Sequence, residues 1–169
     1  MAFRLTEERA LTEPQIDARV DEVLGFVGLT EFADRMPASL SGGQRRRVGI
    51  ARAMASKPRL LLFDDPITGL DPLIATTIDD EIVKLRDLED VTTFVVTHQI
   101  RDAFYIAEHR AETRNGKIEV VKEDAAKIAG VEFMVLHEGT IIFQGNASEL
   151  LAATDPYLVE YLYKTLPPW

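Results

Sequence analysis

The sequence predicts an α/β protein with short parallel strands in its core. Two apolar runs, Leu60–Phe63 and Val91–Thr97, each end in polar side chains, and a helical pattern of apolar residues lies between them. Parallel strands need a crossover of about a dozen residues or more, usually a helix, so this order is typical of a strand–helix–strand unit. Helices are expected before this unit, and a β-hairpin with further helices is expected after it.

Composition favours one compact domain of 169 residues, 46% of them hydrophobic. The net charge of −9 argues against a nucleic-acid-binding surface, which is normally basic. No apolar run approaches the roughly 18 residues of a membrane span, and no signal peptide is visible. The absence of cysteine fits a reducing cytoplasm.

The first helix is expected to begin at Thr12, because Thr12 and Gln15 form a capping-box pattern and Pro14 lies in the first turn. Gly28 is its expected C-terminal cap. The apolar stripe of this helix comprises Ile16, Val20, Val23, Leu24 and Val27.

A second helix is predicted from Ser41 to a point before Lys57–Pro58. Ser41 and Gln44 repeat the capping-box pattern, and Gly42 and Gly43 add no side chains to the first turn. Bare N–H groups at the positive end of a helix suit phosphate, although capping alone favours an ordinary helix start. Each glycine costs about 1 kcal/mol relative to alanine, which indicates a ligand or a close backbone approach. The three arginines that follow are expected on a solvated face: Arg45, Arg46 and Arg47.

Two carboxylates, Asp64 and Asp65, follow the apolar run Leu60–Phe63. The length and flanks of this run predict a buried parallel strand, and open α/β sheets bind ligands at the carboxyl ends of their strands. Because neighbouring side chains alternate in direction, one aspartate can hold Mg²⁺ through water while the other points elsewhere. The alternative is an ordinary polar turn, since Asp–Asp–Pro is good turn chemistry.

The turn Thr68–Asp71 leads into a third helix, with Pro72 in its first turn. Asp79, Asp80 and Glu81 are expected on the solvent side of this helix. Its expected buried stripe comprises Ile74, Ile78, Ile82 and Leu85.

His98 directly follows the strand predicted at Val91–Thr97. It is expected at the same edge as Asp64 and Asp65, which favours a functional over a structural role. His109 is expected to interact with the C-terminal end of a helix. His137 lies in a predicted hairpin turn and is not a candidate.

Residues 112–130 separate the last predicted helix of the core from a C-terminal hairpin. The pair Asn115–Gly116 is a hairpin-turn signal within this segment. The segment is either a partner-specific insertion or a surface loop, and the loop is favoured. The elements expected in this part of the chain are a strand at Lys117–Val121, a short helix at Glu123–Ile128, a hairpin at 131–143 with its turn at 137–140, a helix at Glu149–Leu151 and a helix from Pro156.

Four motifs resemble those of ABC-type ATPases in their family order. Leu40–Gln44 (LSGGQ) is similar to the signature motif and Leu60–Asp64 to the Walker B strand. Gly69–Asp71 resembles the D-loop, and Val95–His98 resembles the strand of the switch histidine. Four motifs in one order are far more specific than any one of them.

The resemblance covers almost the whole chain and implies part of a P-loop NTPase-like domain. Residues 1–40 would form its helical subdomain, 41–110 would carry the four motifs, and 111–169 would hold the insertion, the hairpin and the terminal helices. Contacts with membrane-spanning subunits would involve Phe3, Arg4 and residues 28–36.

The resemblance also implies the site residues. ATP and Mg²⁺ bind between two paired domains in this family. The signature residues Ser41, Gly42, Gly43 and Gln44 would bind the γ-phosphate in trans. The other roles would be magnesium binding by Asp64, general-base catalysis by Asp65, a γ-phosphate contact by His98 and a dimer-interface contact by Asp71.

The implied function is ATP binding and hydrolysis coupled to transport across a membrane. The implied partners are a second ATPase domain and transmembrane permease subunits, at the inner face of the cell membrane, and no nucleic acid is expected. Residues Thr68–Ile82 and Asp155–Val159 look most like the ATPase subunits of Mce/Mla-type lipid transporters.

Three departures from the family pattern affect these expectations. The 169 residues contain no phosphate-binding loop of the form G-x-x-x-x-G-K-[ST]. We therefore expect the loop to be encoded upstream of Met1 and the chain alone to be inactive. Asp65 stands where the family usually has glutamate, and its shorter side chain predicts slower hydrolysis. Gln99 stands where aspartate is more common.

Two other functions stay open from the sequence. A non-catalytic partner would supply only the signature motif in trans, which the missing loop and Asp65 favour. A DNA-acting ABC ATPase is less favoured, because the chain has neither a long coiled-coil pattern nor a basic face.

Overall fold

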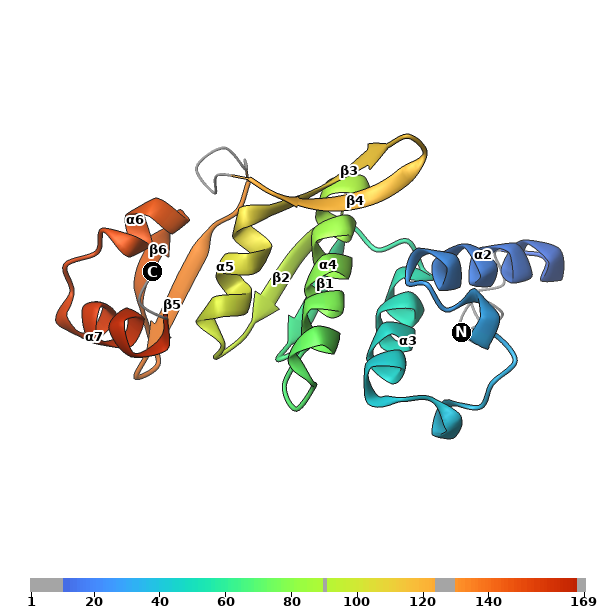
Figure 1. Ribbon diagram of the computed structural model, residues 1–169, viewed down its shortest axis with the longest axis horizontal. Coiled ribbons are helices and arrows are strands. Elements are labelled where there is room, and N and C mark those ends of the chain that lie inside the picture. The colour runs from blue at the N-terminus through green and yellow to red at the C-terminus, as the bar shows by residue number, and fades with distance from the viewer. Residues whose placement is uncertain (1–10, 90, 124–129, 167–169) are drawn as a thin grey trace.

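The computed structural model describes residues 11–89, 91–123 and 130–166. Its elements are α2 (Glu13–Phe26), the 3₁₀ turns η1 (Thr30–Phe32) and η2 (Pro37–Ser39), α3 (Gly42–Met54), β1 (Leu60–Asp64), α4 (Pro72–Leu88), β2 (Thr92–Val96), α5 (Ile100–Glu108), β3 (His109–Arg114), β4 (Lys117–Lys122), β5 (Phe133–His137), β6 (Thr140–Gly145), α6 (Ala147–Leu151) and α7 (Pro156–Thr165). Figure 1 shows them in a row, from α2 and α3 at one end to α6 and α7 at the other. Within the described ranges, no helix is long and apolar enough to span a membrane. The expectations for Phe3, Arg4 and most of Glu123–Ile128 fall on residues outside these ranges.

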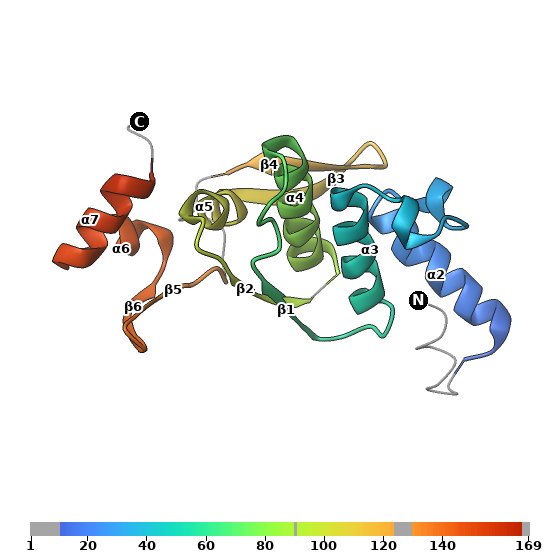
Figure 2. The ribbon, with the colours of Figure 1, turned by 90° about the horizontal axis from the view of Figure 1, so that it is seen from below.

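The predicted strand–helix–strand unit is confirmed. Strands β1 and β2 pair in parallel, from Leu60 opposite Thr92 to Asp64 opposite Val96, and α4 connects them. Figure 2 shows α3 and α4 on one side of this pair. The prediction that β1 is wholly buried is wrong, because the opposite face is uncovered in the described part of the chain. Its apolar side chains are 44–72% exposed, and they are Leu60, Leu62, Phe94 and Val96.

Helix α4 lies at the centre of the main core. Ile78, Ile82 and Leu85 have no exposed surface, as the helical spacing predicts, whereas Ile74 in the first turn is 36% exposed. The prediction that the acidic run 79–81 faces solvent is wrong. Asp79 and Glu81 are buried, because α3 packs against one side of α4 while α5 and β3 pack against another.

Residues 109–122 form a hairpin, which confirms the strand predicted at Lys117–Val121 and its turn at Asn115–Gly116, so this part of the segment is two paired strands and not an irregular loop. Strands β3 and β4 pair along their full length around Asn115 and Gly116, whose positive φ angles suit a two-residue hairpin turn. The end of α4 holds this hairpin. The guanidinium of Arg86 donates to the carbonyl oxygen of His109 at 2.6 Å, and Asp87 accepts from the Ala111 amide at 2.8 Å.

A second core joins α5 to the C-terminal elements. Strands β5 and β6 form the predicted hairpin, with Glu138 and Gly139 at positive φ in its turn. Helix α6 begins at a capping box between Asn146 and Glu149. The buried side chains of this core are Ile100, Phe104, Ala107, Phe133, Ala147, Leu150 and Leu158.

The amino-terminal helix follows the sequence prediction closely. Its capping box between Thr12 and Gln15 is present, and Gly28 just beyond it has φ +65°. Sequence reasoning missed Arg19, which is 8% exposed and donates to the carbonyl oxygens of Met54 and Ala55 at the end of α3. Its spacing within the apolar stripe was a usable signal, because a helical residue placed among buried positions shares their face.

Candidate functional site

The predicted site residues gather at one edge of the molecule. The carboxyl ends of β1 and β2 and the starts of α3 and α4 all lie at the lower edge of Figure 1. This is the edge at which open α/β sheets bind ligands.

Asp65 and His98 are in direct contact at this edge. The Oδ1 atom of Asp65 lies 2.9 Å from Nδ1 of His98 and 3.3 Å from its backbone nitrogen. Asp65 reaches this position just beyond β1, with φ +42° and its amide donating to Val96 at 2.8 Å. Aspartate tolerates this left-handed conformation better than most residues, because its short side chain can hydrogen-bond locally.

This contact favours one tautomer of the imidazole. A carboxylate only accepts hydrogen bonds, so this contact is a hydrogen bond when Nδ1 of His98 carries the ring proton. The Nε2 atom can then donate only when the ring is protonated. The side chain of His98 is 66% exposed and that of Asp65 is 39% exposed, so the pair is open to a ligand from solvent.

Asp64 is the exposed last residue of β1, next to Asp65. No group of three or more metal-ligating side chains is arranged to hold a metal ion among the residues that the structure describes. Mg²⁺ does not need such a group, because it commonly binds one or two carboxylates together with waters and substrate phosphates. The chemistry of Asp64 fits that mode.

The signature residues begin α3 as predicted. Ser41 accepts from the Gln44 amide at 3.2 Å, and the Gln44 side chain accepts from the Ser41 amide at 2.9 Å. The two glycines differ. A Cβ at Gly43 would lie 2.2 Å from Cγ2 of Ile74, so close packing of α3 on α4 explains this glycine. A Cβ at Gly42 would make only ordinary contact, so the exposed Gly42 is the one that packing does not require.

Asp71 caps the amino-terminal end of helix α4 in this chain. Its side chain accepts from the Leu73 amide at 2.9 Å and so caps α4. In the described residues, no hydrogen bond or ion pair links the signature residues 41–44 to Asp64, Asp65 or His98. The edge therefore presents two separate groups, the start of α3 and the Asp65–His98 pair.

Sequence reasoning missed two carboxylates in the helices that follow the site strands, the buried Asp79 and the half-buried Asp102. Asp79 in α4 and Asp102 in α5 each have a buried oxygen without a hydrogen-bond partner in the described chain. Burial, with the charges of Asp102 and Asp80 added, raises the pKa of Asp79 to about 8. Burial also raises the pKa of Asp102. Asp79 therefore keeps its proton at neutral pH.

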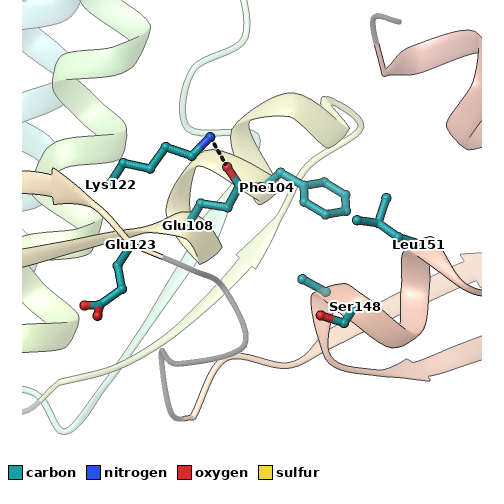
Figure 3. A pocket seen from close by; sticks show the side chains of 7 residues that line it. Phe104, Glu108, Lys122, Glu123, Ser148 and Leu151 are labelled. Carbon is teal, nitrogen blue, oxygen red and sulfur yellow. Dashed lines mark ion pairs between the residues drawn. The ribbon is translucent and has the colours of Figure 1, made fainter. Parts of the chain in front are cut away.

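A cavity of about 350 Å³ lies away from this edge, between α5, β4 and α6. Figure 3 shows Phe104 and Leu151 on one side of it and the ion pair of Glu108 with Lys122, 2.9 Å long, on another. None of the predicted site residues lines it. The predicted site residues therefore lie on an open edge and not in this cavity.

Comparison with known proteins finds ABC transporter ATP-binding proteins that match this chain over part of their length. The family profile described as ABC transporter matches residues 2–68. The sulfate/thiosulfate import ATP-binding protein CysA of Synechococcus elongatus is 41% identical over 125 residues, 74% of this chain and 36% of CysA. Over these residues the chain is similar to ATP-binding proteins of ABC transporters. The putrescine transport ATP-binding protein PotG of Escherichia coli, another similar ABC protein, is 39% identical over 73% of this chain and 32% of its own length.

A solved ABC structure confirms the predicted fold class. The cbiO1 protein of Clostridium perfringens, part of the ABC transporter complex cbiONQ, superimposes with a TM-score of 0.69 and 26% identity. The match covers 98% of this chain and 56% of cbiO1. The chain thus spans about a third of the length of CysA and PotG and about half of cbiO1.

Proposed function

We propose that this chain carries the signature motif, the hydrolytic carboxylate and the switch histidine of an ATP-hydrolysing ABC transporter subunit. The observation that carries the proposal is the contact of Asp65 with His98 at the edge where α3 and α4 begin. ABC ATPases bind and hydrolyse ATP as a family, so the proposal concerns which residues of this chain take part.

Each residue at the edge would have a separate role in ATP hydrolysis. When bound, ATP supplies the phosphoryl group and Mg²⁺ neutralises its charge. Asp64 would hold the metal ion, and the start of α3 at Ser41 and Gly42 would contact the γ-phosphate of a nucleotide held by a second domain. Asp65 would orient a water through Oδ2, because its Oδ1 is engaged by His98. The protonated ring of His98 would donate from Nε2 to a phosphate oxygen.

We also propose that the phosphate-binding loop belongs to protein outside these 169 residues. The uncovered face of β1 and β2 supports this, because contiguous exposed apolar side chains usually mark a contact surface. The length of cbiO1 leaves room for further elements to cover that face. The fragment alone would then not hydrolyse ATP.

The partners and cargo are proposals of the same kind. CysA and PotG are ATP-binding proteins of transport systems, which fits a second ATPase domain and transmembrane permease subunits at the inner face of the cell membrane. The resemblance of Thr68–Ile82 and Asp155–Val159 to Mce/Mla-type subunits supports a lipid as cargo, whereas the two relatives are named for sulfate or thiosulfate and for putrescine. Permease and lipid-binding genes beside this one would support the lipid.

The test is ATP hydrolysis by the product of the reading frame extended upstream of Met1. General-base catalysis typically contributes a factor of about 10² to 10⁴, so Asp65→Asn should lower kcat by at least about 10²-fold. Asp17→Asn, an exposed aspartate on α2, is the matched control and should keep full activity. Equal rates in the two variants would contradict the proposal and favour the non-catalytic partner that supplies the signature in trans.

A further inference from the structure

The turn that carries His98 is held from three directions. The side chain of Asp65 contacts both the ring and the amide of His98. The hydroxyl of Thr97 accepts from the Gln99 amide at 3.0 Å. From the third direction, the hydroxyl of Tyr161 in α7 donates to the carbonyl oxygen of His98 at 3.3 Å, although 63 residues separate the two in sequence.

Helix α7 is anchored so that Tyr161 reaches this carbonyl. Asp155 caps the helix by accepting from the amides of Tyr157 and Leu158 at 2.9 and 3.1 Å. The Leu158 side chain is 1% exposed in the core shared with α5. Burial, and to a smaller extent Tyr157, raises the pKa of Tyr161. Its hydroxyl therefore keeps the proton that it donates.

Aromatic rings extend this connection to the C-terminal hairpin. The rings of Tyr157 and Tyr161 are nearly parallel, with centroids 6.1 Å apart. His137, the last residue of β5, stacks on Tyr157 with centroids 3.7 Å apart. Stacked rings thus connect β5 to α7, and the hydroxyl of Tyr161 connects α7 to the His98 turn.

We propose that Tyr161 is a positioning residue for His98, and that its hydroxyl links the orientation of this histidine to the position of α7. The inference rests on the role proposed above for His98. The O–H···O distance of 3.3 Å is long, so a small displacement of α7 is enough to break or to shorten this bond. The opposite face of α7 is accessible, since Val159 is 51% and Tyr163 is 86% exposed. A contact on that face would therefore change how the His98 ring meets Asp65.

The test uses the 169-residue chain with ¹⁵N-labelled histidine, studied by NMR without nucleotide. Tyr161→Phe keeps the ring and its packing but removes the hydroxyl. Tyr163→Phe makes the same change on the exposed side of α7 and is the matched control. We expect the His98 ring nitrogen signals and the Gln99 amide signal to shift in Tyr161→Phe and to stay in place in Tyr163→Phe.

Unchanged His98 signals in a folded Tyr161→Phe chain, or equal shifts in both variants, would overturn the inference. Should Tyr161→Phe fail to fold, the wild-type chain gives a second readout. Slow exchange of the Tyr161 hydroxyl proton relative to that of Tyr163 supports the bond, and equal exchange overturns it. Because neither measurement involves nucleotide, their failure is distinct from failure of the hydrolysis test for the proposed function.

Discussion

The two ends of helix α4 are built differently. At its C-terminal end, the side chains of Arg86 and Asp87 are 14% and 20% exposed and bind backbone groups of the β3–β4 hairpin and its approach. At its N-terminal end, Asp65 and His98 are 39% and 66% exposed and contact mainly each other. Polar groups at the first end hold the fold together, whereas those at the second are left open to solvent.

Exposure and hydrogen-bond partners therefore distinguish structural polar residues from candidate functional ones in this chain. Hydrogen bonds from a charged group to buried carbonyls contribute to stability, since removing the donor leaves the carbonyls unsatisfied. An exposed ion pair contributes little. We therefore expect substitutions at the C-terminal end to change folding, and substitutions of the Asp65–His98 pair to change activity.

The largest effect is expected for Arg86→Ala. The change removes donors to the carbonyl oxygens of Ile106 and His109 and leaves Asp87 without its ion-pair partner. The free energy of unfolding should fall by about 3 kcal/mol, measured by urea denaturation. Arg46→Ala, at an exposed position of α3, is the control and should change it by less than about 0.5 kcal/mol. Equal losses in the free energy of unfolding of Arg86→Ala and Arg46→Ala would contradict the structural role of Arg86.

A smaller loss is expected for Gly43→Ala, at the site edge but within the packing of α3 on α4. The new Cβ would meet Ile74, so overpacking should cost about 1–3 kcal/mol. Gly49→Ala, in the same helix with no atom within 4 Å of the new Cβ, should instead stabilise the chain by about 0.5–1 kcal/mol. Thermal unfolding of both variants measures the difference. Equal stability of the two variants would show that the close approach of Ile74 does not require glycine at position 43.

The raised pKa of Asp79 predicts that the free energy of unfolding depends on pH. Its pKa is raised from 3.8 to about 8, so between these pH values the folded chain binds more protons than the unfolded chain. Its contribution to stability is therefore greatest below about pH 4 and falls as the pH rises through this window, by at most about 1.4 kcal/mol per pH unit. Asp79→Asn should flatten the fall in urea denaturation series from pH 5 to pH 8. An unchanged slope would show that Asp79 is ionised in the fold.

The smallest stability effect is expected for Asp65→Asn. Asparagine keeps the size of the side chain and tolerates the positive φ angle. Loss of an exposed ion pair costs up to about 1 kcal/mol. A thermal unfolding midpoint close to that of the wild type is the expected result. A loss of stability as large as that of Arg86→Ala would show that the Asp65–His98 pair has a structural role.

Local signals in the sequence predicted much of this fold. The capping boxes at Thr12 and Ser41 and the turn pair Asn115–Gly116 each place an element boundary through neighbouring residues, and the structure confirms all three. The edge shared by Asp65 and His98 was equally predictable, because it follows from the parallel pairing of two strands.

The remaining features depend on residues distant in sequence. Burial of Asp79 requires helices on both sides of α4, which the α4 sequence alone does not reveal. The β3–β4 hairpin is held by Arg86 from more than 20 residues away, and Tyr161 reaches His98 across 63. No local pattern marks such partners. The family motifs likewise indicated the roles of Ser41 and Asp64, which stay predictions.

Mg-ATP binding to the 169-residue chain, measured by isothermal titration calorimetry, is the most direct test of the proposal that the phosphate-binding loop lies outside these residues. The start of α3 and the Asp65–His98 pair would each serve a nucleotide held by a phosphate-binding loop outside this chain. The account predicts no measurable binding by the chain alone and clear binding by the product of the upstream-extended reading frame. Measurable affinity of the isolated chain for Mg-ATP would contradict it.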